Sequence, residues 1–247
     1  MSPTPEQWDP IPEFKGRARG PGPNELAVSC EYPDHDLRYR IEIQPEANGF
    51  RLAVQLDQQL PKALNGKAGF NLEFLPSSYF GKSILLNDEP GIIPRHPDGP
   101  MKMDSDGFAQ PLPLSIGQRI VLAPEDPLLR VAISSDGGPL MLYDGRSKAQ
   151  NGWFVVRTLI PAGKTKDVVV WVIQGWTRPP VVACNQVGYT SGRDKIAVFE
   201  LDPLYKGKMV ALSIRAIRFF QRSRAGDLRN RIRRPRECSV PNCAAGV

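Results

Sequence analysis

The sequence predicts an all-β chain with an N-terminal β-sandwich, and three observations support this. The 247 residues include 25 Pro and 22 Gly, which helix interiors tolerate poorly because Pro lacks a donor N–H and Gly loses more backbone entropy on folding. Several short runs alternate apolar and polar residues, the pattern of a strand with one buried face. Turn residues separate these runs along the chain. Together they favour short strands packed as a sandwich over residues 26–177.

The first elements follow from local patterns. Residues 1–25 are rich in Pro and Gly, and we expect them to form an extended, disordered lead-in. Two alternating runs, 37–43 and 50–57, then flank the dipeptide Asn48-Gly49. Because Asn-Gly is a strong hairpin-turn signal, an antiparallel hairpin is predicted here.

Further strands are predicted at 70–74, 119–122, 128–134, 140–143, 153–160 and 168–173. The run 168–173 has no polar face, as expected of a strand buried on both sides. Residues 87–113 are dense in Pro, Gly and Asp and predict a long loop, unusual for a compact domain and therefore of functional interest.

The charge pattern excludes some partner classes. The formal charge is +6, but the segment from Lys208 to the end holds ten Lys and Arg against two acids. Residues 1–207 therefore carry 32 − 10 = 22 basic and 26 − 2 = 24 acidic residues, so the main body lacks the basic surface of a nucleic-acid-binding protein. We expect no nucleic-acid partner. No apolar run approaches the roughly 18 residues needed to cross a membrane, and the N-terminus lacks the apolar region of a signal peptide.

No cofactor or metal site is predicted. The four cysteines (Cys30, Cys184, Cys238 and Cys243) form no Cys-x-x-Cys pair, and the chain has only two histidines. A structural zinc site needs four such ligands, usually in closely spaced pairs. The acids of the 87–113 loop lack calcium-loop spacing.

The most specific motif lies beyond a stiff Pro-Pro linker at 179–180, where a new apolar run starts at Val181. It comprises Asn185, Gln186, Val187, Gly188 and Tyr189, followed by Lys195-Ile196-Ala197-Val198. This order resembles the opening of the immunoglobulin-like domain of family-9 glycoside hydrolases, the cellulase type: an apolar strand, NQVGY, a short turn, then K-x-A-V. The turn here lacks the Pro of many members. Asn185, Gln186, Val187, Gly188, Tyr189 and Lys195 are expected to be structural, at a strand end.

Residues 69–76, 79–83 and 91–94 resemble, less specifically, the extra β-sandwich that precedes this domain in some bacterial members. The fold class is thus a β-sandwich, the start of an immunoglobulin-like β-sandwich at 181–207, and a basic irregular tail at 208–247.

The resemblance implies a parent enzyme that hydrolyses β-1,4-glucans or related carbohydrates, usually secreted or periplasmic. Its chemistry would lie in an (α/α)6 barrel, where an Asp pair in a D-A-G-D motif activates water and a distant Glu protonates the leaving oxygen. An immunoglobulin-like domain takes about 100 residues, and 247 − 180 = 67 remain after Pro180. We therefore expect a truncated domain, no catalytic residues and no activity of the chain alone. The near-match Arg224-Ala225-Gly226-Asp227 has Arg where a carboxylate is required.

Several alternatives stay open. For the tail, an out-of-frame reading stands first, ahead of a basic amphipathic helix or a nucleic-acid or membrane-surface tail. For the whole chain, the rival is a stand-alone carbohydrate-binding module. Trp176 is then the surface candidate for a sugar contact, whereas Trp153 and Trp171 lie in apolar runs and are expected to fill the core.

Overall fold

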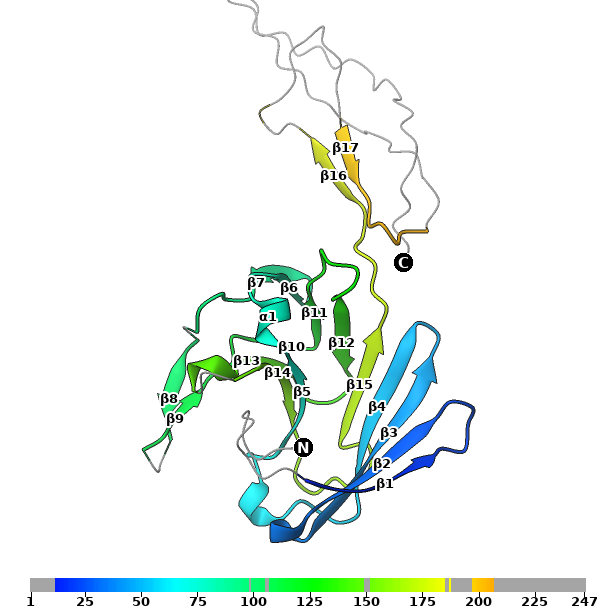
Figure 1. Ribbon diagram of the computed structural model, residues 1–247, viewed down its shortest axis with the longest axis vertical. Helices are drawn as coiled ribbons and strands as arrows, with labels where there is room; N and C mark the ends of the chain where they lie inside the picture. The colour runs from blue at the N-terminus through cyan, green and yellow to red at the C-terminus, as the bar shows by residue number, and fades with distance from the viewer. Residues whose placement is uncertain are drawn as a thin grey trace, which may run out of the picture. The chain divides into compact units, whose positions relative to one another are not determined.

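The computed structural model describes residues 12–97, 99–104, 107–148, 152–184, 187 and 197–206. The chain divides into two compact units between Trp176 and Thr177. Unit 1 is built from antiparallel sheets (Figure 1). The predicted all-β, sandwich-type fold class is confirmed.

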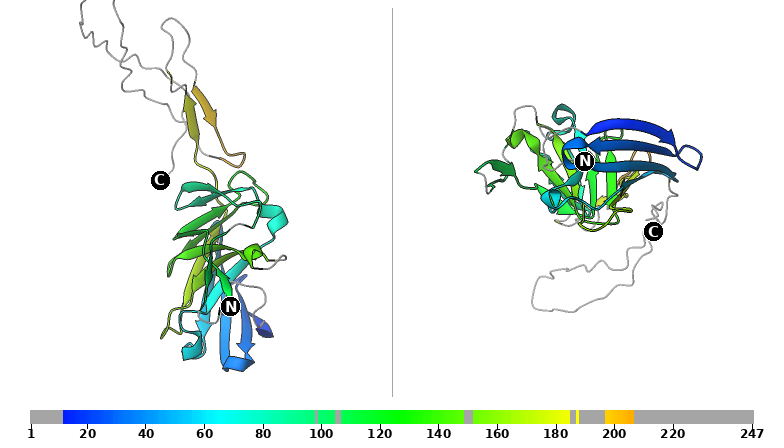
Figure 2. Two further views of the ribbon diagram at one scale, coloured as in Figure 1. Left: turned by 90° about the vertical axis from the view of Figure 1, so that its left-hand side faces the viewer. Right: turned by 90° about the horizontal axis from the view of Figure 1, so that it is seen from below.

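The larger sheet of unit 1 has nine strands among the described residues, in the order β1-β2-β3-β4-β15-β12-β11-β6-β7. In that order its strands are β1 (Glu13–Arg19), β2 (Leu26–Tyr32), β3 (Leu37–Glu46), β4 (Gly49–Leu56), β15 (Val169–Gln174), β12 (Val131–Ser135), β11 (Arg119–Leu122), β6 (Ser83–Leu86) and β7 (Glu89–Ile92). The strands β1, β2 and β3, in blue, lie together at one end of unit 1 (Figure 2).

The smaller sheet has the order β10-β13-β14-β5. Its strands are β10 (Ser115–Gly117), β13 (Leu140–Asp144), β14 (Phe154–Leu159) and β5 (Gly69–Phe74). The remaining elements of unit 1 are the hairpin β8 (Met101–Met103) and β9 (Ala109–Pro111), the helix α1 (Pro76–Tyr79) and the 3-10 turns η1 (Pro33–His35), η2 (Lys62–Leu64) and η3 (Gly145–Ser147).

The hairpin predicted around Asn48-Gly49 is confirmed as β3 and β4, which pair antiparallel from Tyr39↔Leu56 to Glu46↔Gly49. The turn lies one residue earlier than the dipeptide, because Gly49 already pairs with Glu46. Gly49 also pairs with Gln174 of β15. A Cβ at this position would lie 1.8 Å from the carbonyl oxygen of Ile173, so only glycine lets the two backbones approach this closely.

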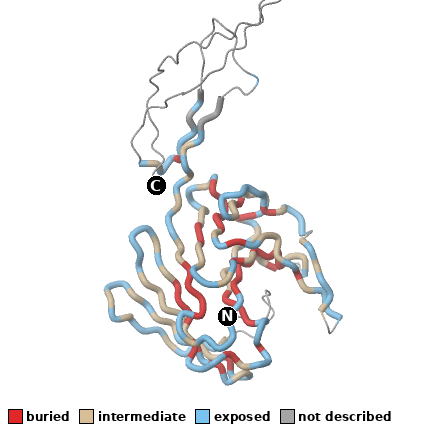
Figure 3. Tube along the Cα trace, turned by 180° about the vertical axis from the view of Figure 1, so that it is seen from behind, coloured by how far each residue is buried: buried red, intermediate tan, exposed pale blue. Residues whose placement is uncertain are grey.

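The core lies between the two sheets and contains side chains of both. Trp171 of β15 and Phe154 of β14 are at most 1% exposed, and the Phe70 ring of β5 meets Trp171 edge to face at 4.9 Å. Figure 3 shows that buried stretches concentrate in the middle of unit 1, whereas the N-terminal strands are mostly exposed or intermediate. The first half of β15 is buried on both faces as predicted, since Val169, Val170 and Trp171 are all buried.

Two expectations are corrected. Part of the predicted lead-in, Glu13–Arg19, is strand β1, which pairs with β2. Its own pattern lacks a buried face, so the pairing partner and the ion pair of Lys15 with Glu31 (2.8 Å) stabilise it instead. The predicted long loop at 87–113 contains three short strands: β7, which pairs with the preceding β6, and the hairpin of β8 with β9.

A buried ion pair closes the end of β13. Asp144 is 1% exposed and accepts hydrogen bonds from the Arg146 backbone N–H and guanidinium. Arg146 also donates to the carbonyls of Pro94 and Arg95. The pair therefore joins η3 to the segment that follows β7.

Unit 2 contains one described hairpin, β16 (Val181–Cys184) and β17 (Ala197–Glu200), paired antiparallel from Val181↔Glu200 to Cys184↔Ala197. Asp202 is 5% exposed and accepts hydrogen bonds from the backbone N–H groups of Arg178 (3.0 Å) and Leu204 (2.9 Å). The tail predicted at 208–247 lies outside the described residues, and the immunoglobulin-like assignment stays a prediction.

Candidate functional site

The loop that joins β11 to β12 has a fixed shape set by one carboxylate. It begins at Ala123, whose φ of +48° is unusual for a residue with a side chain. Asp126 Oδ1 accepts hydrogen bonds from the N–H groups of Leu128 (3.0 Å) and Leu129 (3.3 Å). Such an Asx-type turn stabilises a tight loop without regular structure.

Side chains from neighbouring elements hold this loop in place. Lys82 Nζ lies 2.9 Å from Asp126 Oδ2, and the Tyr79 hydroxyl of α1 donates to the Leu129 carbonyl at 2.8 Å. Glu125 accepts the N–H of Ser83 at 2.9 Å. The loop is therefore tied to α1 and to the start of β6.

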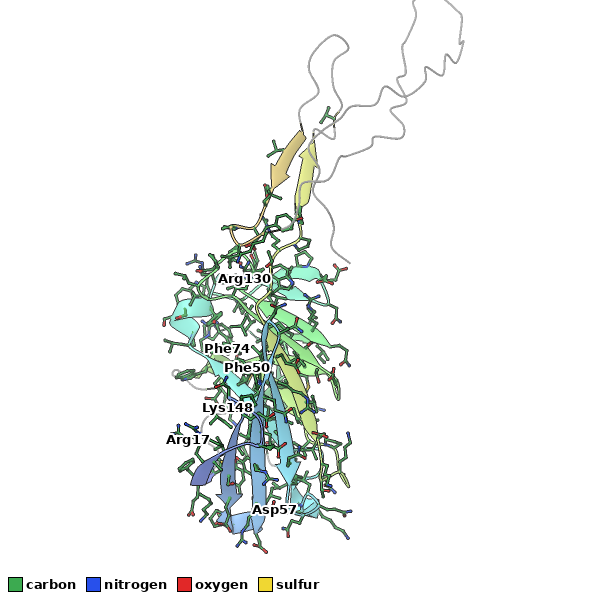
Figure 4. The ribbon with its side chains drawn as sticks, turned by 90° about the vertical axis from the view of Figure 1, so that its right-hand side faces the viewer. Arg17, Phe50, Asp57, Phe74, Arg130 and Lys148 are labelled. Carbon is green, nitrogen blue, oxygen red and sulfur yellow. The ribbon has the colours of Figure 1, made fainter. Side chains whose placement is uncertain are left out.

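Arg130, the last residue of this loop, contacts Trp176, the tryptophan proposed from the sequence as a surface residue. Its guanidinium carbon lies 5.6 Å from the centroid of the Trp176 ring, within cation–π range. The backbone N–H of Arg130 also donates to the backbone carbonyl of Asp126 (2.9 Å), and its Nη1 donates to the carbonyl of Pro124 (3.2 Å). In Figure 4, Arg130 lies at one end of unit 1 and Asp57 at the other. We call Arg130, Trp176 and the loop 123–130 the Arg130–Trp176 site.

The site joins a partly buried indole ring, a fixed cation and an exposed apolar tip, because Leu128 is 93% exposed. Rings of this kind pack against the apolar faces of ligands, and guanidinium groups donate several hydrogen bonds in one plane. The arrangement is suited to binding a hydroxyl-rich, ring-containing molecule.

The electrostatics of the site are those of a fixed ion pair. The hydrogen bond from Lys82 is the main cause that lowers the pKa of Asp126 below its usual value, and the hydrogen bond from the Leu128 N–H is the second. The hydrogen bond between Lys82 and Asp126 also raises the pKa of Lys82. Both groups therefore stay charged at neutral pH, which makes them poor proton-transfer partners for one another.

The described residues contain no cluster of three or more His, Cys, Asp or Glu side chains that could hold a metal ion. Within the same part of the chain, no helix is long and apolar enough to span a membrane.

The motif residues and the other two tryptophans discussed from the sequence lie as follows. Asn185, Gln186, Gly188, Tyr189 and Lys195 lie outside the described residues, and Val187 is 98% exposed. Trp171 fills the core as predicted, whereas Trp153 is only partly buried. Sequence reasoning missed Arg130, although its place three residues after the turn-rich run Pro-Glu-Asp-Pro (124–127) was a signal for a shaped loop.

No protein-family model, no curated protein and no solved structure matches this chain.

Proposed function

We propose that this chain is the N-terminal, non-catalytic portion of a family-9 glycoside hydrolase that degrades β-1,4-glucans or related polysaccharides. One observation carries the proposal: NQVGY lies between two paired apolar strands. The strand β16 ends at Cys184, directly before the motif, and β17 begins at Ala197, the alanine of K-x-A-V. Along the sequence, strand, motif and second strand follow one another in the order with which the family's immunoglobulin-like domain opens.

The antiparallel sandwich of unit 1 adds support, because the resemblance implies such a domain upstream of the motif. Catalysis in the parent enzyme would then belong to a separate barrel, and this chain would contribute no acid or base to it. The Arg224-Ala225-Gly226-Asp227 segment has no role in this proposal.

The decisive experiment reads the coding DNA beyond codon 207 in all three frames. The proposal expects one frame to continue the immunoglobulin-like domain and then to encode a true D-A-G-D motif. Three frames without either feature would contradict it. A second test adds the purified chain to carboxymethylcellulose and to an aryl cellobioside. We expect no release of reducing ends from the first substrate and no release of the phenol from the second. Hydrolysis of either substrate by the chain alone would contradict the proposal.

A second candidate function, carbohydrate binding by the sandwich itself, is favoured by the Arg130–Trp176 site. Native electrophoresis through a gel containing soluble β-glucan should then slow the chain, and Trp176→Ala should abolish the retardation while Trp176→Phe preserves part of it. Phe108→Ala is the matched control, since Phe108 is 64% exposed and lies in a different loop. Equal mobility of the wild-type chain with and without glucan would exclude this function.

A further inference from the structure

The core-facing side of the larger sheet continues beyond the core toward its edge strand. We call this side the inner face, since it carries the fully buried Val54 of β4. Val54 pairs with Ile41 of β3, which pairs with Val28 of β2, and both of these are only partly buried. Val28 pairs with Arg17 of β1, which is exposed. Burial thus falls step by step from β4 to β1 while the side chains stay apolar until the last strand.

The neighbouring row repeats this order. Leu52 is 6% exposed and pairs with the partly buried Ile43. Ile43 pairs with Leu26, which is 37% exposed, and Leu26 pairs with the exposed Arg19. We call the four apolar residues Leu26, Val28, Ile41 and Ile43, with Arg17 and Arg19 at their border, the open flank.

The opposite face of the same strands has a different chemistry. There, Glu31 accepts ion pairs from Lys15 (2.8 Å) and Arg38 (3.1 Å), and Arg40 lies 3.3 Å from Glu42. Those charges are paired and solvated, as expected of a face in water.

On the open flank, by contrast, Arg17 and Arg19 make no ion pair or side-chain hydrogen bond within the described part of the chain. The inner-face positions of β1 to β4 hold no carboxylate. Figure 4 shows Arg17 on β1, at the edge of the sheet. An apolar strip bordered by unpaired guanidinium groups is the usual composition of a protein-binding surface.

We propose that the open flank binds an acidic amphipathic helix of a partner protein. Its apolar part spans two strands about 4.8 Å apart, which suits the roughly 10 Å diameter of a helix laid along them. Arg17 and Arg19 are two residues apart on one strand, about 6.6 Å. Acidic side chains four residues apart on a helix are separated by about 6 Å, so two of them can meet both guanidinium groups.

Charge and shape argue against other occupants. A second copy bound through its own open flank, or the Arg-rich segment after Lys208, would bring cations against Arg17 and Arg19. A single strand added to the edge of β1 would meet the arginines but leave Leu26, Val28 and Ile41 uncovered. The proposal does not depend on the proposed function.

The test uses the full chain and a synthetic helical peptide of about 14 residues with a leucine stripe and two glutamates four residues apart on one flank. Fluorescence anisotropy should show binding that weakens as salt rises, because exposed charge pairs are screened. Replacing the glutamates by glutamine, or making Arg17→Ala with Arg19→Ala, should weaken binding about tenfold. The matched control is Arg38→Ala with Arg40→Ala on the opposite face, which should bind as the wild type does.

These variants change exposed side chains, so thermal unfolding should show that all of them fold. Equal affinity for the glutamate and glutamine peptides, or unchanged binding by the Arg17/Arg19 variant, would overturn the proposal. So would dimerisation that the Arg17/Arg19 variant abolishes, which would assign the flank to a second copy. Retardation by carboxymethylcellulose that needs both arginines, without peptide binding, would assign it to an anionic glycan.

Discussion

Arg146 binds both oxygens of the Asp144 carboxylate, with Nε 2.9 Å from Oδ1 and Nη2 2.8 Å from Oδ2. The same guanidinium donates to the carbonyls of Pro94 (2.7 Å) and Arg95 (2.9 Å), and its carbon lies 4.5 Å from the centroid of the Phe154 ring. The side chains of Arg146 and Asp144 are only 10% and 1% exposed. One planar cation therefore satisfies a buried carboxylate and two loop carbonyls at once.

Removing this cation should be costly. We expect Arg146→Ala to lower the free energy of unfolding by about 3 kcal/mol, because it leaves Asp144 buried without its counterion. Arg146→Lys should recover less than half of that loss, since an ammonium cannot form the two-point contact. Urea unfolding measures both. Arg119→Ala, whose pair with Asp88 is 40% and 71% exposed, should stay within about 0.5 kcal/mol of the wild type. A similar loss in both alanine variants would refute this account.

Gly49 should not tolerate a side chain. A Cβ there would lie 1.8 Å from the Ile173 oxygen, so Gly49→Ala must separate β4 from β15 and should cost about 3 kcal/mol or more. Gly16 of β1 is the matched control because a Cβ would meet nothing within 4 Å. Circular dichroism melts compare the two, and equal melting temperatures would show that the β4–β15 contact adapts.

The core tryptophan carries an unsatisfied donor. Trp171 Nε1 is buried and has no hydrogen-bond partner among the described residues. Trp171→Ala should cost about 3–5 kcal/mol through the cavity it leaves. Trp171→Phe should cost less than about 1.5 kcal/mol, since it removes the unpaired N–H along with part of the ring. Chemical denaturation distinguishes them, and a phenylalanine variant as unstable as the alanine variant would mean that the N–H is satisfied.

The Lys82–Asp126 pair predicts a defined response to acid. The pKa of Asp126 is lowered from its usual 3.8 in the folded chain, so between these two values the unfolded chain binds more protons and stability falls as pH falls. This contribution is present above about pH 4 and is lost below it. Asp126→Asn should therefore flatten the stability profile below that pH. Lys82→Met should flatten it only in part, because the backbone N–H groups of Leu128 and Leu129 still lower the pKa of Asp126. Adding Asp126→Asn to Lys82→Met should therefore flatten the profile further, but by less than Asp126→Asn does in the wild type. Independent effects of the two substitutions on the acid limb would contradict the pairing.

Local patterns predicted much of the sandwich. Strands such as β3, β4 and β14 show alternation or an apolar run of adequate length, and the Asn48-Gly49 turn also predicted that β3 pairs with β4. Strands of three or four residues, such as β8 and β10, contain too few positions to show a period. The strand β1 has no buried face and depends on β2. The strand β2 is different: Leu26, Val28, Cys30 and Tyr32 do alternate, so its signal was available.

The candidate site was less predictable. Trp176 could be chosen as a surface residue from its loop position, but its neighbour Arg130 lies 176 − 130 = 46 positions earlier in the sequence. Their contact depends on how the loop 123–130 folds around Asp126, which no local period encodes. The charge on the open flank depends likewise on register, because a shift of one residue in β1 would move Arg17 to the solvated face.

The order of strands in the larger sheet has a consequence for synthesis of the chain. The strand β4 ends at Leu56, and its neighbour β15 begins at Val169, 169 − 56 = 113 positions later. At about 5–20 residues per second a ribosome needs roughly 6 to 23 seconds to cover that distance. During this interval the meander β1–β4 has emerged with one border unpaired and its apolar side uncovered. We therefore expect nascent unit 1 to bind a holding chaperone until β15, the last strand of the unit, has been synthesised.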